Sequence, residues 1–173
     1  MLHDRAPGLW NRTEESVAGL YFEEFYEGQV FEHELRKTLT ESDNMMFSTM
    51  TLNPQPLHID RHFSQQTEWG QPLMNSLLTL GLVIGVSVGD TTLGTTIGNL
   101  GMKDTQFPNP VFQGDTVRAV TEVVGVRASR SKPDRGVIDF LHKGYNQDDV
   151  LVCSCHRQAM MRRRPSADNS EAS

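Results

Sequence analysis

Cysteine is scarce in this sequence, and basic residues are outnumbered by acidic ones. Its two cysteines, Cys153 and Cys155, lie on one face of a predicted strand, which suits neither a structural disulfide nor, alone, a metal site. We expect two buried thiols. The net charge of −6 argues against nucleic acid as the main partner, because binding to its backbone needs a basic face. No apolar run follows the first charged residues, which predicts no secretory signal and a cytosolic location.

The length of 173 residues suits one domain with a single core. Its 37% of hydrophobic and 22% of charged residues are typical of a soluble globular protein. We expect a flexible arm over residues 1–20, a folded domain over 21–161 and a disordered, solvated tail over 162–173, which begins with three adjacent arginines.

An uncharged segment over residues 72–88 predicts the longest helix of the chain. The segment is apolar nearly all round, so such a helix is either buried or spans a membrane. It is short for a membrane span and contains Asn75 and Ser76, so we expect a buried central helix. Gly81 and Gly85, four residues apart, would let a strand or a second helix approach closely.

Alternating apolar residues predict an early strand over 30–39 and four later strands, over 93–102, 116–126, 136–145 and 150–161. Between them, Thr40 is a predicted N-cap for a short helix that extends through Met50. Asp115 is interpreted as a turn residue rather than a catalytic one. Four consecutive strands after a buried helix indicate an α+β fold with an antiparallel sheet packed on that helix.

A polar cluster precedes the long helix, in the stretch Asn53-Pro54-Gln55-Pro56-Leu57-His58-Ile59-Asp60. Because each proline fixes its own φ and restricts the residue before it, we expect a stiff, non-helical loop from which Asn53 and His58 project. Such stiffness suits catalysis. Two other interpretations remain: His58, Asp60 and His62 as metal ligands, although a third histidine is missing, or His58 as an ordinary half-buried side chain.

Four segments resemble motifs of one known family and occur in the same order: Tyr26 to Gln29, Thr38 to Asp43, Asn53 to Asp60, and Phe107 to Thr116. Over about residues 22–160 the chain is similar to MaoC-like dehydratases, the (R)-specific enoyl-CoA hydratase branch of the hotdog fold. The resemblance implies a single hotdog, a long helix wrapped by an antiparallel sheet, since no repeat for a second one is present. It also implies a homodimer or a dimer of dimers that shares its acyl-CoA tunnel, and no cofactor or metal is expected.

The activity implied by the resemblance is hydration of a 2-enoyl-CoA thioester, with His58 in the place of the catalytic histidine. Asn53 stands where the family usually has an aspartate. An amide can orient water but cannot take its proton at neutral pH, so we expect His58 to be the general base and Asn53 to hold the water. A carboxylate of Asp60, Asp43 or Glu68 could assist instead, although Asp60 is also expected to cap the following turn.

For the thioester oxyanion, the resemblance points to backbone N–H groups near Asn75 and Ser76, in the first turn of the long helix. The family often has His-Gly at these two positions. The segments 53–60 and 70–76 are similar to those of members associated with mesaconyl-CoA or itaconyl-CoA. In that case Arg61 would bind the second carboxylate through paired hydrogen bonds.

Two other functions remain open on this fold. An acyl-CoA thioesterase typically places an acidic residue on or near the central helix, and none occurs between Glu68 and Asp90. The loss of the usual aspartate favours a non-catalytic acyl-CoA-binding protein. Function depends on the site rather than on the fold, so the geometry around His58 has to decide between them.

Overall fold

The computed structural model describes residues 19–165, and residues 1–18 of the predicted arm and 166–173 of the predicted tail lie outside the described residues. A five-stranded antiparallel sheet, with strand order β1-β3-β4-β5-β2, dominates the structure. Its strands are β1 (Val30–Thr38), β2 (Thr96–Gln106), β3 (Thr116–Ala128), β4 (Arg135–Tyr145) and β5 (Leu151–Arg162). A 3-10 turn, η2 (Phe22–Glu24), precedes the sheet.

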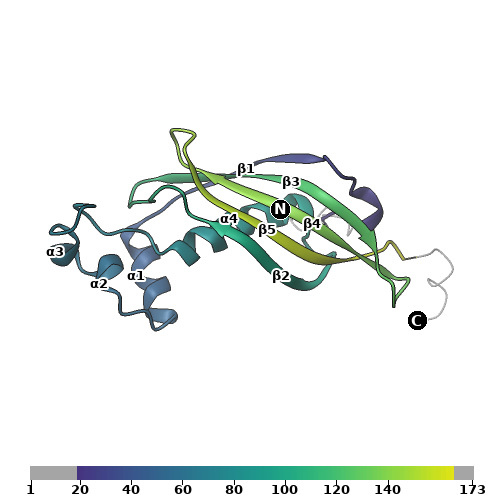
Figure 1. Ribbon diagram of the computed structural model, residues 1–173, viewed down its shortest axis with the longest axis horizontal. Helices are drawn as coiled ribbons and strands as arrows, with labels where there is room; N and C mark the ends of the chain where they lie inside the picture. The colour runs from purple at the N-terminus through teal and green to yellow at the C-terminus, as the bar shows by residue number, and fades with distance from the viewer. Residues whose placement is uncertain (1–18, 166–173) are drawn as a thin grey trace, which may run out of the picture.

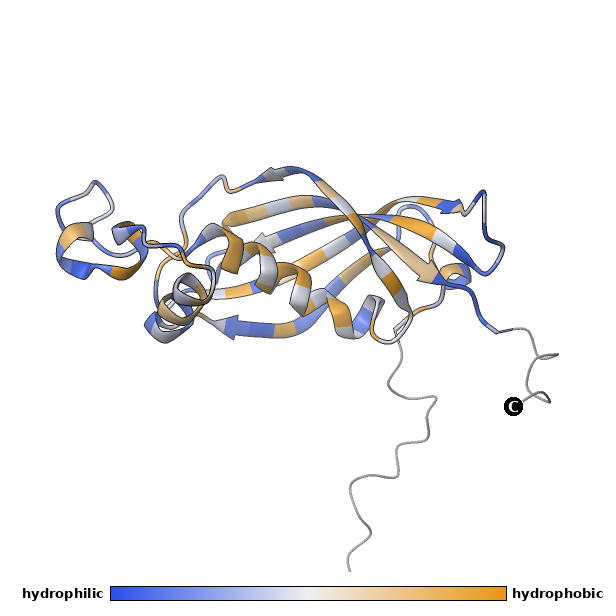
Figure 2. Cartoon of the chain, turned by 90° about the horizontal axis from the view of Figure 1, so that it is seen from below, coloured by the Kyte–Doolittle hydropathy of each residue, from blue (hydrophilic) through white to orange (hydrophobic). Residues whose placement is uncertain are grey.

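The long helix α4 (Ser76–Thr91) lies along one face of this sheet, as Figures 1 and 2 show. The predicted α+β fold, with an antiparallel sheet on a central helix, is therefore confirmed. The helix begins four residues later than predicted because Asn75 caps it, accepting the Leu77 N–H through Oδ1 at 3.0 Å. It also ends later, so β2 starts at Thr96 rather than at residue 93.

Three short helices lie beyond one end of the sheet: α1 (Glu41–Met50), α2 (Pro56–Ile59) and α3 (Arg61–Ser64) (Figure 1). The predicted N-cap of α1 is confirmed, since Thr40 Oγ1 accepts the Asp43 N–H at 3.2 Å. The expectation of a non-helical loop over 53–60 is confirmed for residues 53–55 and was wrong for Pro56–Ile59, which form α2. Pro56 occupies the first turn of α2, where the absent N–H costs nothing and its restricted φ favours a helix.

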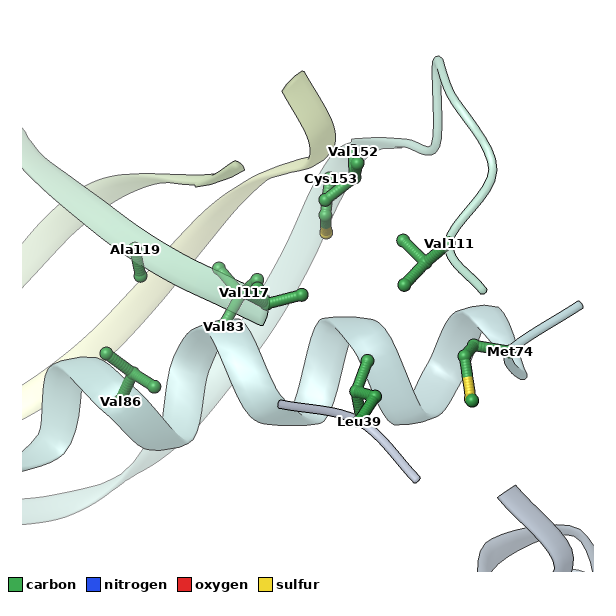
Figure 3. Packing of buried hydrophobic residues seen from close by; sticks show 9 residues of the cluster. All are labelled: Leu39, Met74, Val83, Val86, Val111, Val117, Ala119, Val152 and Cys153. Carbon is green, nitrogen blue, oxygen red and sulfur yellow. The ribbon is translucent and has the colours of Figure 1, made fainter. Parts of the chain in front are cut away.

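Buried aliphatic side chains fill the space between α4 and the sheet (Figure 3). Val83 on α4 is fully buried, and a Cβ atom at Gly144 of β4 would lie only 2.4 Å from its Cγ2 atom. The close approach between helix and sheet therefore depends on a glycine of the strand. Gly81 and Gly85 were predicted to let a strand or a second helix approach closely. Within one chain this was wrong, since an added Cβ at either position would meet no described atom within 4 Å.

The two cysteines lie on β5 as free, buried thiols, as predicted. Burial, together with the neighbouring Cys155, raises the pKa of Cys153 to about 12. A thiol with so high a pKa is almost never a thiolate at neutral pH, so Cys153 is unreactive. Its contribution is to the packing against α4.

The predicted start of the tail at residue 162 needs correction. Strand β5 continues to Arg162, and the next two arginines form ion pairs with η2: Arg163 Nη1 lies 3.3 Å from Glu23 Oε1, and Arg164 Nη2 lies 2.7 Å from Glu24 Oε1. These arginines also stack on aromatic rings of the same turn. The ordered chain thus extends past the proposed domain boundary because η2 offers carboxylates to it.

Candidate active site at the start of the long helix

His58 is a half-buried residue of α2 whose ring orientation is fixed by one hydrogen bond. Its Nδ1 atom lies 3.0 Å from the carbonyl oxygen of Leu73. A carbonyl only accepts hydrogen bonds, so the proton of the neutral ring resides on Nδ1. Nε2 is left with a lone pair, and no described residue bonds to it. This arrangement suits a general base, which has to present an unprotonated nitrogen to its substrate.

Asn53, the predicted water holder, is half-buried in the turn that precedes α2. Its Oδ1 accepts the N–H of Gln55 at 3.1 Å, and its own N–H donates to Ser48 O at 2.9 Å. No direct hydrogen bond joins Asn53 and His58 among residues 19–165. Asn53 Oδ1, which accepts the Gln55 N–H, has a second lone pair, and the side-chain N–H₂ of Asn53 keeps two protons to donate. A role as water holder stays a prediction.

The site includes one residue that the sequence did not single out, Asn44 of α1. It is 2% exposed, and its side chain bonds to three backbone groups, those of His58, Leu73 and Asn75. A signal for it was present, because asparagine is unfavourable inside a helix unless its side chain has a specific partner. That signal does not identify the partners, which are distant in the sequence.

At the first turn of α4 only part of the predicted oxyanion site is available. The N–H of Asn75 already donates to Asn44 Oδ1 at 2.8 Å, so the expectation that it binds a thioester oxygen was wrong. The Ser76 N–H is the first of the helix, has no intrahelical acceptor and bonds to no described residue. The side-chain Nδ2 of Asn75 has no partner among residues 19–165, but it is fully buried, and Asn75 does not line the cavity described below. The free Ser76 N–H is therefore the donor suited to a developing negative charge.

A cavity of about 220 Å³ lies beside this helix start. Two hydroxyl residues of α4, Ser76 and Thr79, line it together with apolar side chains, among them Trp69, Leu73, Phe107 and Val152. His58 does not itself line the cavity. Its Nδ1–H bonds to the carbonyl of Leu73, and Leu73 is one of the lining residues. The cavity is thus apolar with a few polar groups, which is typical of a site for a small acyl group.

Two of the three acidic residues considered as helpers, Asp60 and Asp43, are bound to neighbouring groups. Asp60 Oδ1 accepts the Phe63 N–H at 2.9 Å, which confirms its predicted role as a cap. Asp43 is bound to Thr40, whose hydroxyl and N–H hold the pKa of this carboxyl below its usual value. Glu68 is exposed, and so is Arg61, whose side chain has no hydrogen bond or ion pair to a described residue. Between residues 19 and 165, no three His, Cys, Asp or Glu side chains gather as a metal site.

Two features of the loop before β3 agree with the sequence analysis. Asp115 Oδ2 accepts the Phe112 N–H at 2.8 Å, and Asp115 Oδ1 accepts from Gln147 Nε2 at 2.9 Å. Gly114 has a φ of +94°, a conformation that glycine adopts at little cost. The predicted turn role of Asp115 is therefore confirmed. This turn connects the lining of the cavity to the first residue of β3.

A long helix lying on an antiparallel sheet is the architecture of the hotdog fold. A Mycobacterium tuberculosis protein whose structure has a double hotdog fold matches with a TM-score of 0.78 and 28% identity, over 86% of this chain and 46% of that one. The profile of the MaoC like domain matches residues 24–142. The chain belongs to this family, and the resemblance inferred from the sequence is confirmed.

Two relatives have names that specify an activity. The chain is 31% identical to a beta-methylmalyl-CoA dehydratase of Chloroflexus aurantiacus, over 88% of this chain and 43% of the relative. It is 28% identical to a mesaconyl-CoA hydratase of Cereibacter sphaeroides, over 87% of this chain and again 43% of the relative. The chain therefore spans less than half the length of these relatives. No helix between residues 19 and 165 has the length and apolarity to cross a membrane.

Proposed function

We propose that this chain is a hydro-lyase that adds water reversibly to a 2-enoyl-CoA thioester. The observation that carries the proposal is the hydrogen bond between His58 Nδ1 and the Leu73 carbonyl, which leaves Nε2 as a base beside the start of α4. The names of the relatives, a dehydratase and a hydratase of CoA thioesters, support the same reaction class. The proposed hydration requires no metal or cofactor, since proton transfer and oxyanion binding suffice.

In the proposed reaction, His58 Nε2 takes a proton from a water molecule held with Asn53. The hydroxide oxygen bonds to the β-carbon. The π pair of the C=C bond then forms a double bond between the α-carbon and the carbonyl carbon, and the carbonyl π pair moves onto the thioester oxygen, which gives an enolate. The Ser76 N–H stabilises this charge. Protonated His58 then returns the proton to the α-carbon, which completes the addition and restores the neutral base. Atoms and charge balance without a further reactant.

For the substrate, we propose a short branched dicarboxylic enoyl-CoA of the mesaconyl-CoA or itaconyl-CoA type. A cavity of about 220 Å³ suits a short acyl group rather than a long chain. Arg61 is exposed at the start of α3, three residues after His58. An arginine there could bind the second carboxylate in a bidentate way. The cytosolic location stays a prediction.

The test is loss of enoyl-thioester absorbance after purified protein is mixed with mesaconyl-CoA or crotonyl-CoA, beside His58→Ala and Asn53→Ala. Turnover that needs His58 supports the hydratase, and a faster reaction with mesaconyl-CoA supports the dicarboxylic substrate. Release of free thiol without hydration would indicate a thioesterase instead. Binding of either thioester without any reaction would indicate an acyl-CoA-binding protein.

We also propose that two copies of the chain associate as a homodimer, or as a dimer of dimers. The outer face of α4 is exposed along Leu77, Gly81 and Gly85, although an apolar helix is expected to be covered. Beside it, the edge strand β2 exposes Ile97, Leu100 and Met102. An apolar helix face next to an unpaired strand edge needs a partner. The double length of the relatives supports a second hotdog unit as that partner.

The dimer is expected to dissociate in Gly85→Glu, because this change places a charge on a face where two helices would approach closely. Light scattering after size-exclusion chromatography should give two or four times the chain mass of 19.5 kDa for the native protein, a dimer or a dimer of dimers, and a lower mass for the variant. Ser131→Glu, in the exposed β3–β4 turn, introduces the same charge and should stay dimeric. A monomeric native protein, or a dimeric Gly85→Glu, would contradict the proposal.

A further inference from the structure

The side chain of Asn44 makes three hydrogen bonds, all to backbone groups of other segments. Its Nδ2 donates to the His58 carbonyl at 2.8 Å and to the Leu73 carbonyl at 2.9 Å. Its Oδ1 accepts the Asn75 N–H at 2.8 Å. Both protons of the amide nitrogen and one lone pair of the oxygen are used, so the buried side chain is fully paired.

The orientation of this amide is determined by the nature of its partners. Carbonyl oxygens only accept, and a backbone N–H only donates, so a flipped amide would face two acceptors with its oxygen and one donor with its nitrogen. Asn44 is only 2% exposed, so water cannot replace a lost partner cheaply. The side chain is therefore held in one orientation. Aspartate has the same shape but cannot donate to the two carbonyls.

These bonds connect the two parts of the proposed reaction centre. The Leu73 carbonyl accepts from Asn44 Nδ2 and also from His58 Nδ1, so Asn44 orients the acceptor that determines the tautomer of the base. The Asn75 N–H precedes the Ser76 N–H, which is the free donor at the helix start. One side chain thus holds both the base and the oxyanion donor against α1.

We propose that Asn44 is a positioning residue that sets the tautomer of His58 and the distance between this base and the Ser76 N–H. This inference rests on the proposed hydratase function. Asn44 has no free donor for a substrate and does not line the cavity, so it acts through the residues that it holds. Because a displacement of about 1 Å can cost on the order of 10²-fold in rate, a loss of these bonds should reduce turnover far more than binding.

The test compares Asn44→Asp and Asn44→Ser with Ser48→Ala in hydration of mesaconyl-CoA and crotonyl-CoA. Ser48 lies one turn further along α1 and is 1% exposed, and its hydroxyl bonds to no described residue. We expect kcat to fall by about 10- to 100-fold in both Asn44 variants, with KM changed less than about threefold. Ser48→Ala should remain within about twofold of the native kcat. Asn44→Ser is the second variant in case the carboxylate prevents folding.

A second readout needs no substrate: the ring ¹⁵N chemical shifts of neutral His58, which report which nitrogen carries the proton. The native protein should show one tautomer with the proton on Nδ1, and the Asn44 variants a mixture. If the native protein hydrates neither thioester, the proposed function is wrong. The tautomer of His58 in the native and variant proteins still tests whether Asn44 positions this ring. A native tautomer or kcat in folded Asn44 variants, or an equal loss in Ser48→Ala, would overturn the inference.

Discussion

His58→Ala is expected to lower kcat/KM for the preferred enoyl-CoA by about 10²- to 10⁴-fold, the range of a lost general acid–base group. His58 would both remove the proton from water and return it to the α-carbon, so no step of the reaction proceeds normally without it. Two of the described carboxylates nearby are already bound, since Asp43 belongs to the capping box of α1 and Asp60 caps α3. Steady-state hydration kinetics over a range of substrate concentrations measure the effect.

The matched control is His62→Ala. His62 lies on the next helix, is exposed, and among the described residues its ring bonds only to Gln66 at 3.1 Å. Its loss should change kcat/KM less than about twofold. A His58→Ala protein that is folded and retains native turnover would exclude His58 as the base. The base would then have to come from another segment or from a second chain.

Acid is expected to destabilise the fold through His142, by about 1 kcal/mol for each pH unit as the pH falls from 6.5 toward 3. His142 is fully buried on β4, with Nδ1 2.9 Å from Thr121 Oγ1, and its Nε2 has no partner in the part of the chain that the structure describes. Burial, followed by the positive charge of Arg157 and the nearby His33, lowers the pKa of His142 from 6.5 to about 3. In the folded protein it is therefore neutral throughout this range.

The direction of the effect follows from proton binding. Below pH 6.5 the unfolded chain takes up a proton at His142 and the folded chain does not, so falling pH favours unfolding until the folded-state pKa is reached. Urea unfolding from pH 6.5 to 4, at one protein concentration, measures the slope. His142→Leu should have a shallower slope. His156→Leu, on the opposite face of the adjacent strand, should keep the native slope, and equal slopes in all three proteins would contradict the prediction.

Much of the fold could be predicted because its signals are local. Thr40 and Asp60 cap the helices that follow them, and Asp115 closes the turn next to Gly114, each through bonds to residues within three positions. The alternation of apolar residues likewise predicted all five strands, with the largest error at β2. The error at the start of β2 arose beside α4, since the end of an apolar helix and the start of an apolar strand carry the same hydrophobic signal. The strand also continues to Gln106, four residues past its predicted end.

By itself, the sequence determined the fold class, the order of the elements and the segment that contains His58, because these depend on propensities and periodicity within short stretches. The tertiary structure alone decided which groups meet. It brought Asn44 to residues 14, 29 and 31 positions away, and it occupied the Asn75 N–H that the sequence had assigned to the oxyanion. Hydrogen-bond partners between distant segments depend on how those segments pack, which no local pattern encodes.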